Sequence, residues 1–124
     1  MLKKLLILLF ISFSFNLYAA EKQSTFTMKK FNDAQKIGKV IVIHSWDKNC
    51  LTCAKQVKIL NEAQKDFPNV VFLSYEQIKD KKIAKLLDVK YWTTIVVYKG
   101  KNEKAKEIGM VNKEEIYKLI RKEI

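Results

Sequence analysis

Residues 40–53 read VIVIHSWDKNCLTC, and this stretch decides the fold. It begins with an apolar run, Val40 to Trp46, that is too continuous for a half-exposed strand and therefore predicts a central strand buried on both faces. Two cysteines, Cys50 and Cys53, follow the run. A helical pattern of apolar residues starts directly after them. The sequence thus predicts a pair of thiols at the junction between a strand and a helix.

The position of this pair favours redox chemistry. At a helix N-terminus the unpaired N–H groups and the dipole favour negative charge, so a thiol there ionises readily and can attack a disulfide. A structural disulfide closing so small a ring would contribute only about 2 kcal/mol. Zinc or an iron–sulfur cluster usually takes four ligands, whereas the chain has two cysteines and one histidine. We therefore predict a redox pair with no metal and no cofactor, and keep a structural disulfide and a metal site shared by two chains as alternatives.

The first twenty residues have the pattern of a secretory signal peptide. Two lysines precede an apolar stretch at 5–15, and Ala19 and Ala20 offer small residues at a cleavage point. The stretch is shorter than the roughly 20 residues that a membrane span needs. We expect residues 1–20 to be removed after Ala19 or Ala20 and the protein to be exported, in the bacterial periplasm. It would associate with the membrane only if this segment stayed uncleaved.

The chain is strongly basic, but its charges do not form a nucleic-acid-binding pattern. Lys and Arg number 24 against 13 Asp and Glu, which gives a net charge of +11. The lysines are spread along the chain, and Arg121 is the sole arginine. Export also removes the usual nucleic-acid partner. We expect a monomer with a solvated lysine surface and no nucleic-acid partner.

Residues 21–124 are long enough for one modest core and predict a single domain. A strand, a helix that ends at Pro68 and a second strand predict a parallel pair joined by a crossover. Before the central strand we expect an edge strand at 24–28 and a helix at 31–37, with Asn32 or Asp33 near its start. The second strand is expected at 70–75, and a helix at 77–87 should place Ile83, Leu86 and Leu87 in the core. A hairpin at 94–108 with a turn at 99–102 and a last helix opened by Asn112 and Glu115 complete the domain.

This order of elements, with two cysteines between a buried strand and a long helix, resembles the thioredoxin family over residues 21–124. Trp46, four residues before Cys50, stands where thioredoxins carry a tryptophan beside the active site. Residues 89–101 are similar to the loop, strand and hairpin of the family that face the disulfide. The resemblance implies an α/β fold: a single thioredoxin-like domain with a central mixed sheet flanked by helices, preceded by the signal peptide.

The resemblance also implies a thiol–disulfide oxidoreductase. Cys50 would attack a disulfide of a partner protein, and Cys53 would then release the partner. Such an enzyme requires protein thiols or disulfides as substrates and a further protein as electron donor or acceptor, and a reductase dedicated to one partner is one form of it. Lys48 and Lys55 are either ordinary surface lysines of a basic protein or a source of favourable charge near Cys50. The alternative is a redox-inert or metal-handling binding module with the same fold.

Two departures from the family lie close to the cysteines. Leu51 and Thr52 replace a glycine and a proline between them, so we expect a different reduction potential. His44 stands where thioredoxins have a buried aspartate that accepts a proton from the second cysteine. His44 is therefore either a replacement base or a hydrogen-bonded residue of the core.

A third departure lies in the loop opposite the disulfide. Thr93 and Thr94 stand where the family has a cis-proline followed by a threonine. Because a cis bond before another residue costs about 3 kcal/mol, we expect a trans bond and a reshaped loop. In the family this loop offers backbone groups to an extended substrate chain. The resemblance therefore makes Trp46, Trp92, Thr93 and Thr94 candidates to face the substrate, with ordinary packing as the alternative for Trp92.

Overall fold

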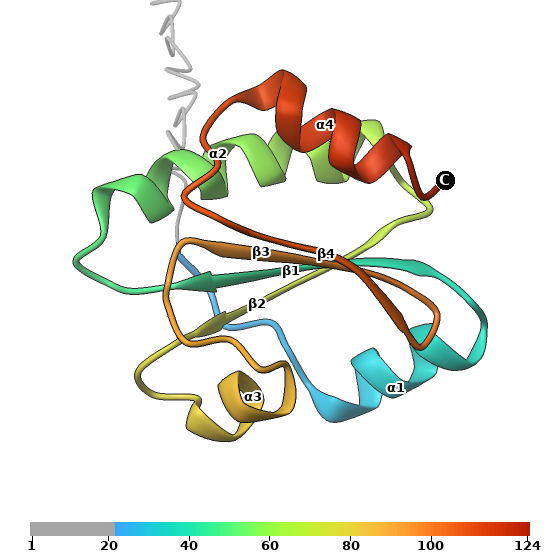
Figure 1. Cartoon of the computed structure of the whole chain (residues 1–124), viewed down its shortest axis with the longest axis horizontal. Coiled ribbons are helices and arrows are strands. Elements are labelled where there is room, and N and C mark those ends of the chain that lie inside the picture. The colour runs from blue at the N-terminus through green and yellow to red at the C-terminus, as the bar shows by residue number, and fades with distance from the viewer. Residues whose placement is uncertain (1–21) are drawn as a thin grey trace, which may run out of the picture.

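The computed structural model describes residues 22–124, and the predicted signal peptide with its cleavage point lies outside them. Within the described part, four strands form one mixed sheet in the order β2-β1-β3-β4. Figure 1 shows α2 and α4 on one face of this sheet and α1 and α3 on the other. The predicted α/β fold, a mixed sheet flanked by helices, is confirmed. The elements are α1 (Met28–Lys36), β1 (Val40–Trp46), α2 (Leu51–Asp66), β2 (Val71–Glu76), α3 (Lys81–Leu86), β3 (Thr94–Lys99), β4 (Asn102–Ile108) and α4 (Lys113–Arg121).

β1 forms the centre of the sheet and of the core, as its apolar run predicts. It pairs in parallel with β2 and antiparallel with β3, and all seven of its residues are buried. Its side chains alternate between two apolar layers. Ile41 and Ile43 pack on the side of α1 and α3, whereas Val40 and Val42 pack under α2 and α4. Burial of each such side chain contributes about 1.5–3 kcal/mol, so both layers hold the strand in place.

α2 follows β1 after the four residues 47–50 and returns the chain to the start of β2. It begins at Leu51, directly after Cys50, and ends at Asp66 before Pro68. Its buried face includes Val57, Leu60 and Ala63 at helical spacing. The predicted parallel pair of strands and the helix between them are therefore confirmed.

The predicted edge strand at 24–28 is wrong, because this segment makes backbone bonds to β2 at a single carbonyl, forms no strand of the sheet, and has its last residue in α1. The N–H groups of Thr25 and Phe26 both bond to the carbonyl of Ser74, and the chain then enters α1. The helix begins at Met28, three residues before its predicted start. Its N-cap is Thr27, whose hydroxyl accepts a bond from the Lys30 N–H at 3.1 Å, rather than Asn32 or Asp33.

The helix predicted at 77–87 is shorter than expected. Residues 77–80 form a turn in which the Asp80 N–H bonds to the Glu76 carbonyl. α3 therefore spans only Lys81–Leu86, and Ala84 and Leu87 face the core. Leu86 is half exposed, so its predicted place in the core is wrong, whereas Ile83 is partly buried against the core.

The C-terminal hairpin and helix agree with the sequence. β3 and β4 are joined by a turn at Gly100, which has a φ of +56° and lies against Gly38, 3.4 Å from where a Cβ would stand. The positive φ favours glycine at this turn, whereas a Cβ would meet Gly38 only at ordinary contact distance. α4 begins after Asn112, whose side chain accepts a bond from the Glu115 N–H at 3.1 Å.

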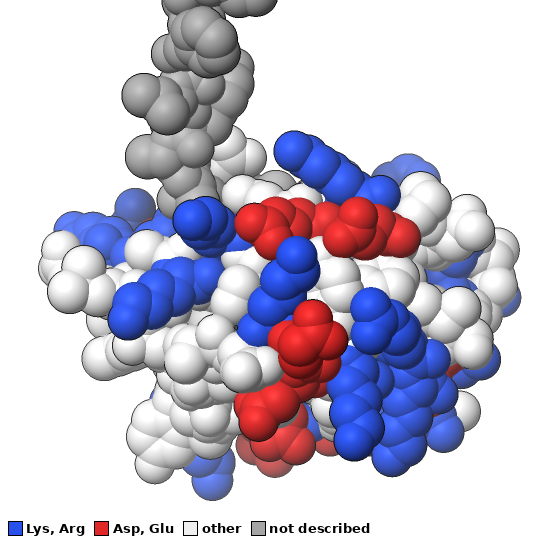
Figure 2. Space-filling model, turned by 90° about the horizontal axis from the view of Figure 1, so that it is seen from above, with Lys and Arg blue, Asp and Glu red and all other residues white. Residues whose placement is uncertain are grey.

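Charges are mixed on the face formed by α2 and α4. Figure 2 shows Lys and Arg side chains interspersed with Asp and Glu over this face. One contact between the two helices is the ion pair of Lys113 with Glu62 at 3.1 Å. In residues 22–124 no helix combines the length and the apolar character that crossing a membrane requires.

Replacing Thr27 by alanine tests the cap of α1. The substitution removes the hydroxyl that accepts the Lys30 N–H, so we expect the free energy of unfolding to fall by about 1 kcal/mol. Asn32→Ala is the matched control, because Asn32 is exposed and caps nothing. Urea denaturation of both variants measures the difference, and an equal loss in both would contradict the assignment of the cap.

Candidate active site

The two cysteines lie at the N-terminus of α2, where the loop after β1 ends. Cys50 is the N-cap residue, with extended backbone, and its sulfur accepts a bond from the Cys53 N–H at 3.0 Å. Asp47 shapes the loop, because its carbonyl and its carboxylate accept bonds from the N–H groups of Cys50 and Asn49. The loop therefore ends in a helix N-terminus at which the Cys53 N–H points at the sulfur of Cys50.

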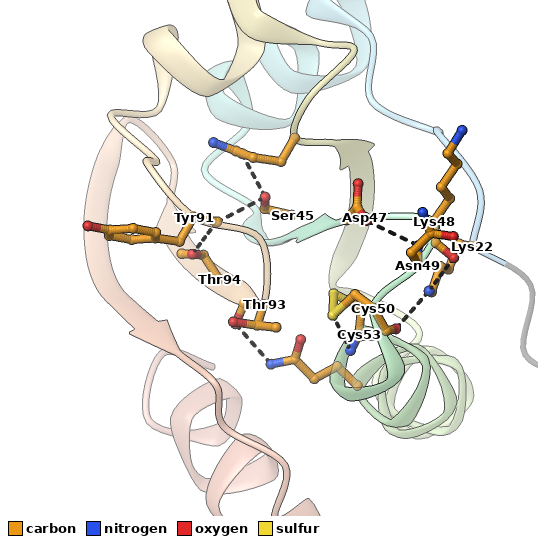
Figure 3. Close-up of a disulfide and its surroundings, with 12 residues drawn as sticks. Lys22, Ser45, Asp47, Lys48, Asn49, Cys50, Cys53, Tyr91, Thr93 and Thr94 are labelled. Carbon is orange, nitrogen blue, oxygen red and sulfur yellow. Dashed lines mark hydrogen bonds between the residues drawn. A yellow bond between two sulfur atoms is a disulfide. The ribbon is translucent and has the colours of Figure 1, made fainter.

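Cys50 and Cys53 form a disulfide, and their Cα atoms are 5.2 Å apart (Figure 3). The two residues differ in access, since Cys50 is 9% exposed and Cys53 is fully buried. Once the pair is reduced, the Cys53 N–H and the helix N-terminus stabilise a thiolate on Cys50. The geometry therefore makes Cys50 the sulfur that meets a substrate and Cys53 the sulfur that attacks from inside.

Trp46 packs against both cysteines at the end of β1. The three residues form a small apolar cluster, and Trp46 is 7% exposed. Its indole N–H donates to the carbonyl of Gln23 at 3.2 Å. The structure thus places Trp46 beside the disulfide, while a contact with substrate stays a prediction.

Lys22 is a charged group at the site that the sequence analysis missed. Figure 3 shows its ammonium beside the loop, where it donates to the carbonyl of Cys50 at 2.7 Å and to that of Lys48 at 3.1 Å. The side chain of Lys48 extends away from the disulfide in the same view. Lys48 and Lys55 are both exposed. Nothing in the sequence around Lys22 signals this contact, because it joins residues 28 positions apart.

His44 is buried in the sheet below the cysteines and is hydrogen-bonded. Its Nε2 lies 2.9 Å from Oε1 of Gln56, and the residue is 3% exposed. The pKa of His44 is lowered from 6.5 to about 4, mainly by burial. The bond to Gln56 raises this pKa and the nearby Lys22 ammonium lowers it further, but both effects are smaller than that of burial. His44 is therefore neutral at pH 7, and its role as proton acceptor for Cys53 stays a prediction.

Gln56 is the second residue of the site that the sequence analysis missed. It lies on α2 three residues after Cys53 and is fully buried. Besides contacting His44, its amide donates to the carbonyls of Thr93 and Met110, each at 3.0 Å. A polar residue among the apolar positions of a helix was the signal that could have revealed it.

The loop opposite the disulfide has trans peptide bonds, as expected for a chain with Thr93 in place of proline. Thr93 adopts a φ of +65°, which is strained for a β-branched residue. Its N–H donates to the Ser45 carbonyl and its carbonyl accepts from the Gly109 N–H, both at 2.9 Å. The next residue, Thr94, is buried and donates from its hydroxyl to the Tyr91 carbonyl at 2.7 Å.

Three large apolar side chains near the disulfide are open to solvent. Leu51 is 84% exposed, Tyr91 62% and Trp92 44%. Leu51 follows Cys50 directly, and the other two belong to the loop that Gln56 joins to α2. Leu51 therefore presents an apolar side chain next to Cys50, whereas Figure 3 shows the ring of Tyr91 pointing away from the disulfide. The contacts of Trp92, Thr93 and Thr94 with substrate stay predictions.

The described residues hold no group of three or more His, Cys, Asp or Glu side chains that could bind a metal ion. His44 bonds to Gln56, and the two sulfurs bond to each other. What this arrangement can do chemically is accept and donate electrons through the disulfide.

Comparison with known proteins finds one family for this fold. The family model described as thioredoxin matches residues 22–122, whereas no curated protein matches the chain. Solved structures that are similar include Trxlp from Edwardsiella tarda, with 15% identity and a TM-score of 0.72 over 77% of this chain and 94% of that one. The thioredoxin of Fasciola hepatica has 21% identity and a TM-score of 0.69, over 77% and 90%. The oxidised mitochondrial thioredoxin 3 of Saccharomyces cerevisiae has 24% identity and a TM-score of 0.67, over 76% and 88%.

The depressed pKa of His44 predicts a loss of stability in acid. The unfolded chain binds a proton at His44 below pH 6.5, whereas the folded chain does so only near pH 4, so unfolding is favoured as the pH falls through this window. The expected loss is about 3 kcal/mol between pH 7 and pH 4. His44→Gln, which keeps a donor toward Gln56, should lack this part of the pH dependence. Urea denaturation across the window measures it, and parallel profiles for the two proteins would contradict the prediction.

Proposed function

We propose that this chain, which belongs to the thioredoxin family and is a thiol–disulfide oxidoreductase, exchanges its disulfide with partner proteins after export from the cytoplasm. One observation carries the exchange itself. The sulfur of Cys50 caps α2 and is bonded to Cys53, and Cys50 keeps 9% of its surface exposed whereas Cys53 is fully buried. Such a pair combines an accessible nucleophile with a resolving thiol one turn away.

The mechanism in the reducing direction begins with the dithiol form. The Cys50 thiolate attacks one sulfur of a substrate disulfide, which forms a mixed disulfide and releases the other substrate sulfur as a thiolate. Cys53 then loses its proton and attacks the Cys50 sulfur, which restores the disulfide of the enzyme and releases the second substrate thiolate. Two electrons pass from the cysteine pair to the substrate, and the reverse sequence oxidises a substrate dithiol.

Protein substrates are supported by exposed apolar side chains at the start of α2 and on the loop opposite the disulfide. Leu51, Tyr91 and Trp92 are exposed there, and such apolar area can be covered by a partner chain. In the described part of the chain, no hydrogen bond occupies the backbone N–H or carbonyl of Trp92. These groups can pair with the main chain of an extended substrate. A second protein must restore the enzyme to its starting state, as electron donor or acceptor.

Export is supported by the amino-acid sequence of residues 1–20. A basic start, a short apolar stretch and two alanines together favour recognition and removal as a signal peptide. We propose that the mature protein works as a monomer in the bacterial periplasm. Association with the membrane would require that the segment stay uncleaved.

Substitution of each cysteine tests the exchange reaction. With a disulfide-bonded protein and dithiothreitol, Cys50→Ser should lower turnover at least about a hundredfold, because no nucleophile reaches the substrate. Cys53→Ser should instead accumulate a mixed disulfide between Cys50 and the substrate, because the resolving thiol is missing. Turnover and mass spectrometry of the adduct measure the two effects. Normal turnover in Cys50→Ser, or a wild-type protein without thiol-dependent turnover, would favour the binding module instead.

Expression of the full-length chain in a Gram-negative bacterium tests export. Wild type should be recovered from the periplasmic fraction with an N-terminus at Ala20 or Glu21, because cleavage follows Ala19 or Ala20. A chain that begins with a methionine followed by residues 21–124 is the control and should stay in the cytoplasm. Fractionation and N-terminal sequencing measure the result, and retention of wild type in the cytoplasm would contradict export.

A further inference from the structure

Gln56 has every polar atom of its side chain paired in a site without solvent. Its amide nitrogen donates to the carbonyls of Thr93 and Met110, and its amide oxygen faces His44. The residue is 0% exposed. A buried amide that uses all its donors and its acceptor is fixed in orientation, because rotation or displacement would leave several groups unpaired.

This orientation determines which nitrogen of His44 carries the proton. The carbonyls of Thr93 and Met110 can only accept, so the nitrogen of the Gln56 amide must face them. Its oxygen must then face Nε2 of His44, at 2.9 Å. An oxygen needs a donor opposite it, so His44 is protonated on Nε2. The neutral imidazole consequently keeps its lone pair on Nδ1.

The same amide holds the loop that lies opposite the disulfide. Thr93 has a φ of +65°, which a β-branched residue adopts only when its surroundings enforce it. Three bonds do so, from Thr93 to Ser45, from Gly109 to Thr93, and from Gln56 to Thr93. Only the bond from Gln56 comes from α2, the helix that carries Cys53.

We propose that Gln56 is the positioning residue of the redox site, which holds the Thr93 loop in place beside the disulfide and fixes His44 in the Nε2–H form. The proposal rests on the proposed function, because the loop has to be in place when a protein substrate lies across it. Exchange with an extended chain requires a fixed distance between the Cys50 sulfur and the loop backbone that binds the chain. A displacement of about 1 Å between them can lower the rate a hundredfold. A small disulfide needs only the sulfur of Cys50.

Gln56→Met tests the proposal in the mature chain, because methionine has a similar length and makes no comparable bonds. We expect kcat/KM for a disulfide-bonded protein such as insulin to fall about tenfold or more, and kcat/KM for a small aromatic disulfide to change less than about threefold. Gln64→Met is the control, since Gln64 lies exposed on the same helix, and it should leave both values unchanged. Equal losses with both substrates, or no loss with either, would overturn the proposal.

A spectrum of the wild-type protein tests the second part without relying on activity. The nitrogen-15 shifts of His44 should show a protonated Nε2 and a bare Nδ1 at pH 7, and in Gln56→Met the two forms should mix. A protonated Nδ1 in wild type would overturn the proposal, even where the variant fails to fold. If wild type turns over neither disulfide while His44 shows the expected form, the proposed function fails and the assignment of the His44 proton to Gln56 stands.

Discussion

The placement of β1 between two apolar layers is the constraint on which the rest of the structure depends. Successive side chains of the strand point to opposite faces, so a slip by one residue would exchange the two layers. It would also move His44 away from Gln56 and shift the end of the strand from which Trp46 and the cysteine loop depart. Ile41, Ile43 and Val42 are almost fully buried. After such a slip their side chains would either become exposed or clash with the side chains of the opposite layer. The position of the disulfide is therefore determined by the packing of β1 between the two apolar layers.

The chemistry of the cysteine pair follows from its place at the end of this strand. The chain leaves the sheet, turns at Asp47 and enters α2 with Cys50 as its cap. The first turn of the helix then buries Cys53 completely and leaves Cys50 slightly exposed. The same turn directs a backbone N–H at the first sulfur. One local geometry thus distinguishes the two thiols, which are chemically identical in the sequence.

The polar groups around the disulfide form a network that compensates for two unusual residues. His44 would be an unpaired donor in the core, and Thr93 would be a strained residue in a free loop, if each stood alone. Gln56 bonds to both, and in doing so joins β1, α2 and the loop before β3. Lys22 makes a comparable connection at the surface, from the N-terminal segment to the carbonyl of Cys50. The site is therefore held by hydrogen bonds that join four separate parts of the chain.

Periodicity and local chemistry in the sequence determined the strands, the long helix, the hairpin and the cysteine pair. Val40 to Trp46 has no polar alternation, the residues after Cys53 repeat at helical spacing, and Asn112 caps a helix wherever that helix packs. These signals are local, so they can be recognised in the sequence without knowledge of the fold. The tertiary structure alone decided the N-terminal segment, the length of α3, and the partners of His44. Thr25 bonds to Ser74, and Gln56 bonds to Thr93, across separations of 49 and 37 residues. Contacts between residues so far apart leave no periodic pattern, because they depend on where packing brings two segments together.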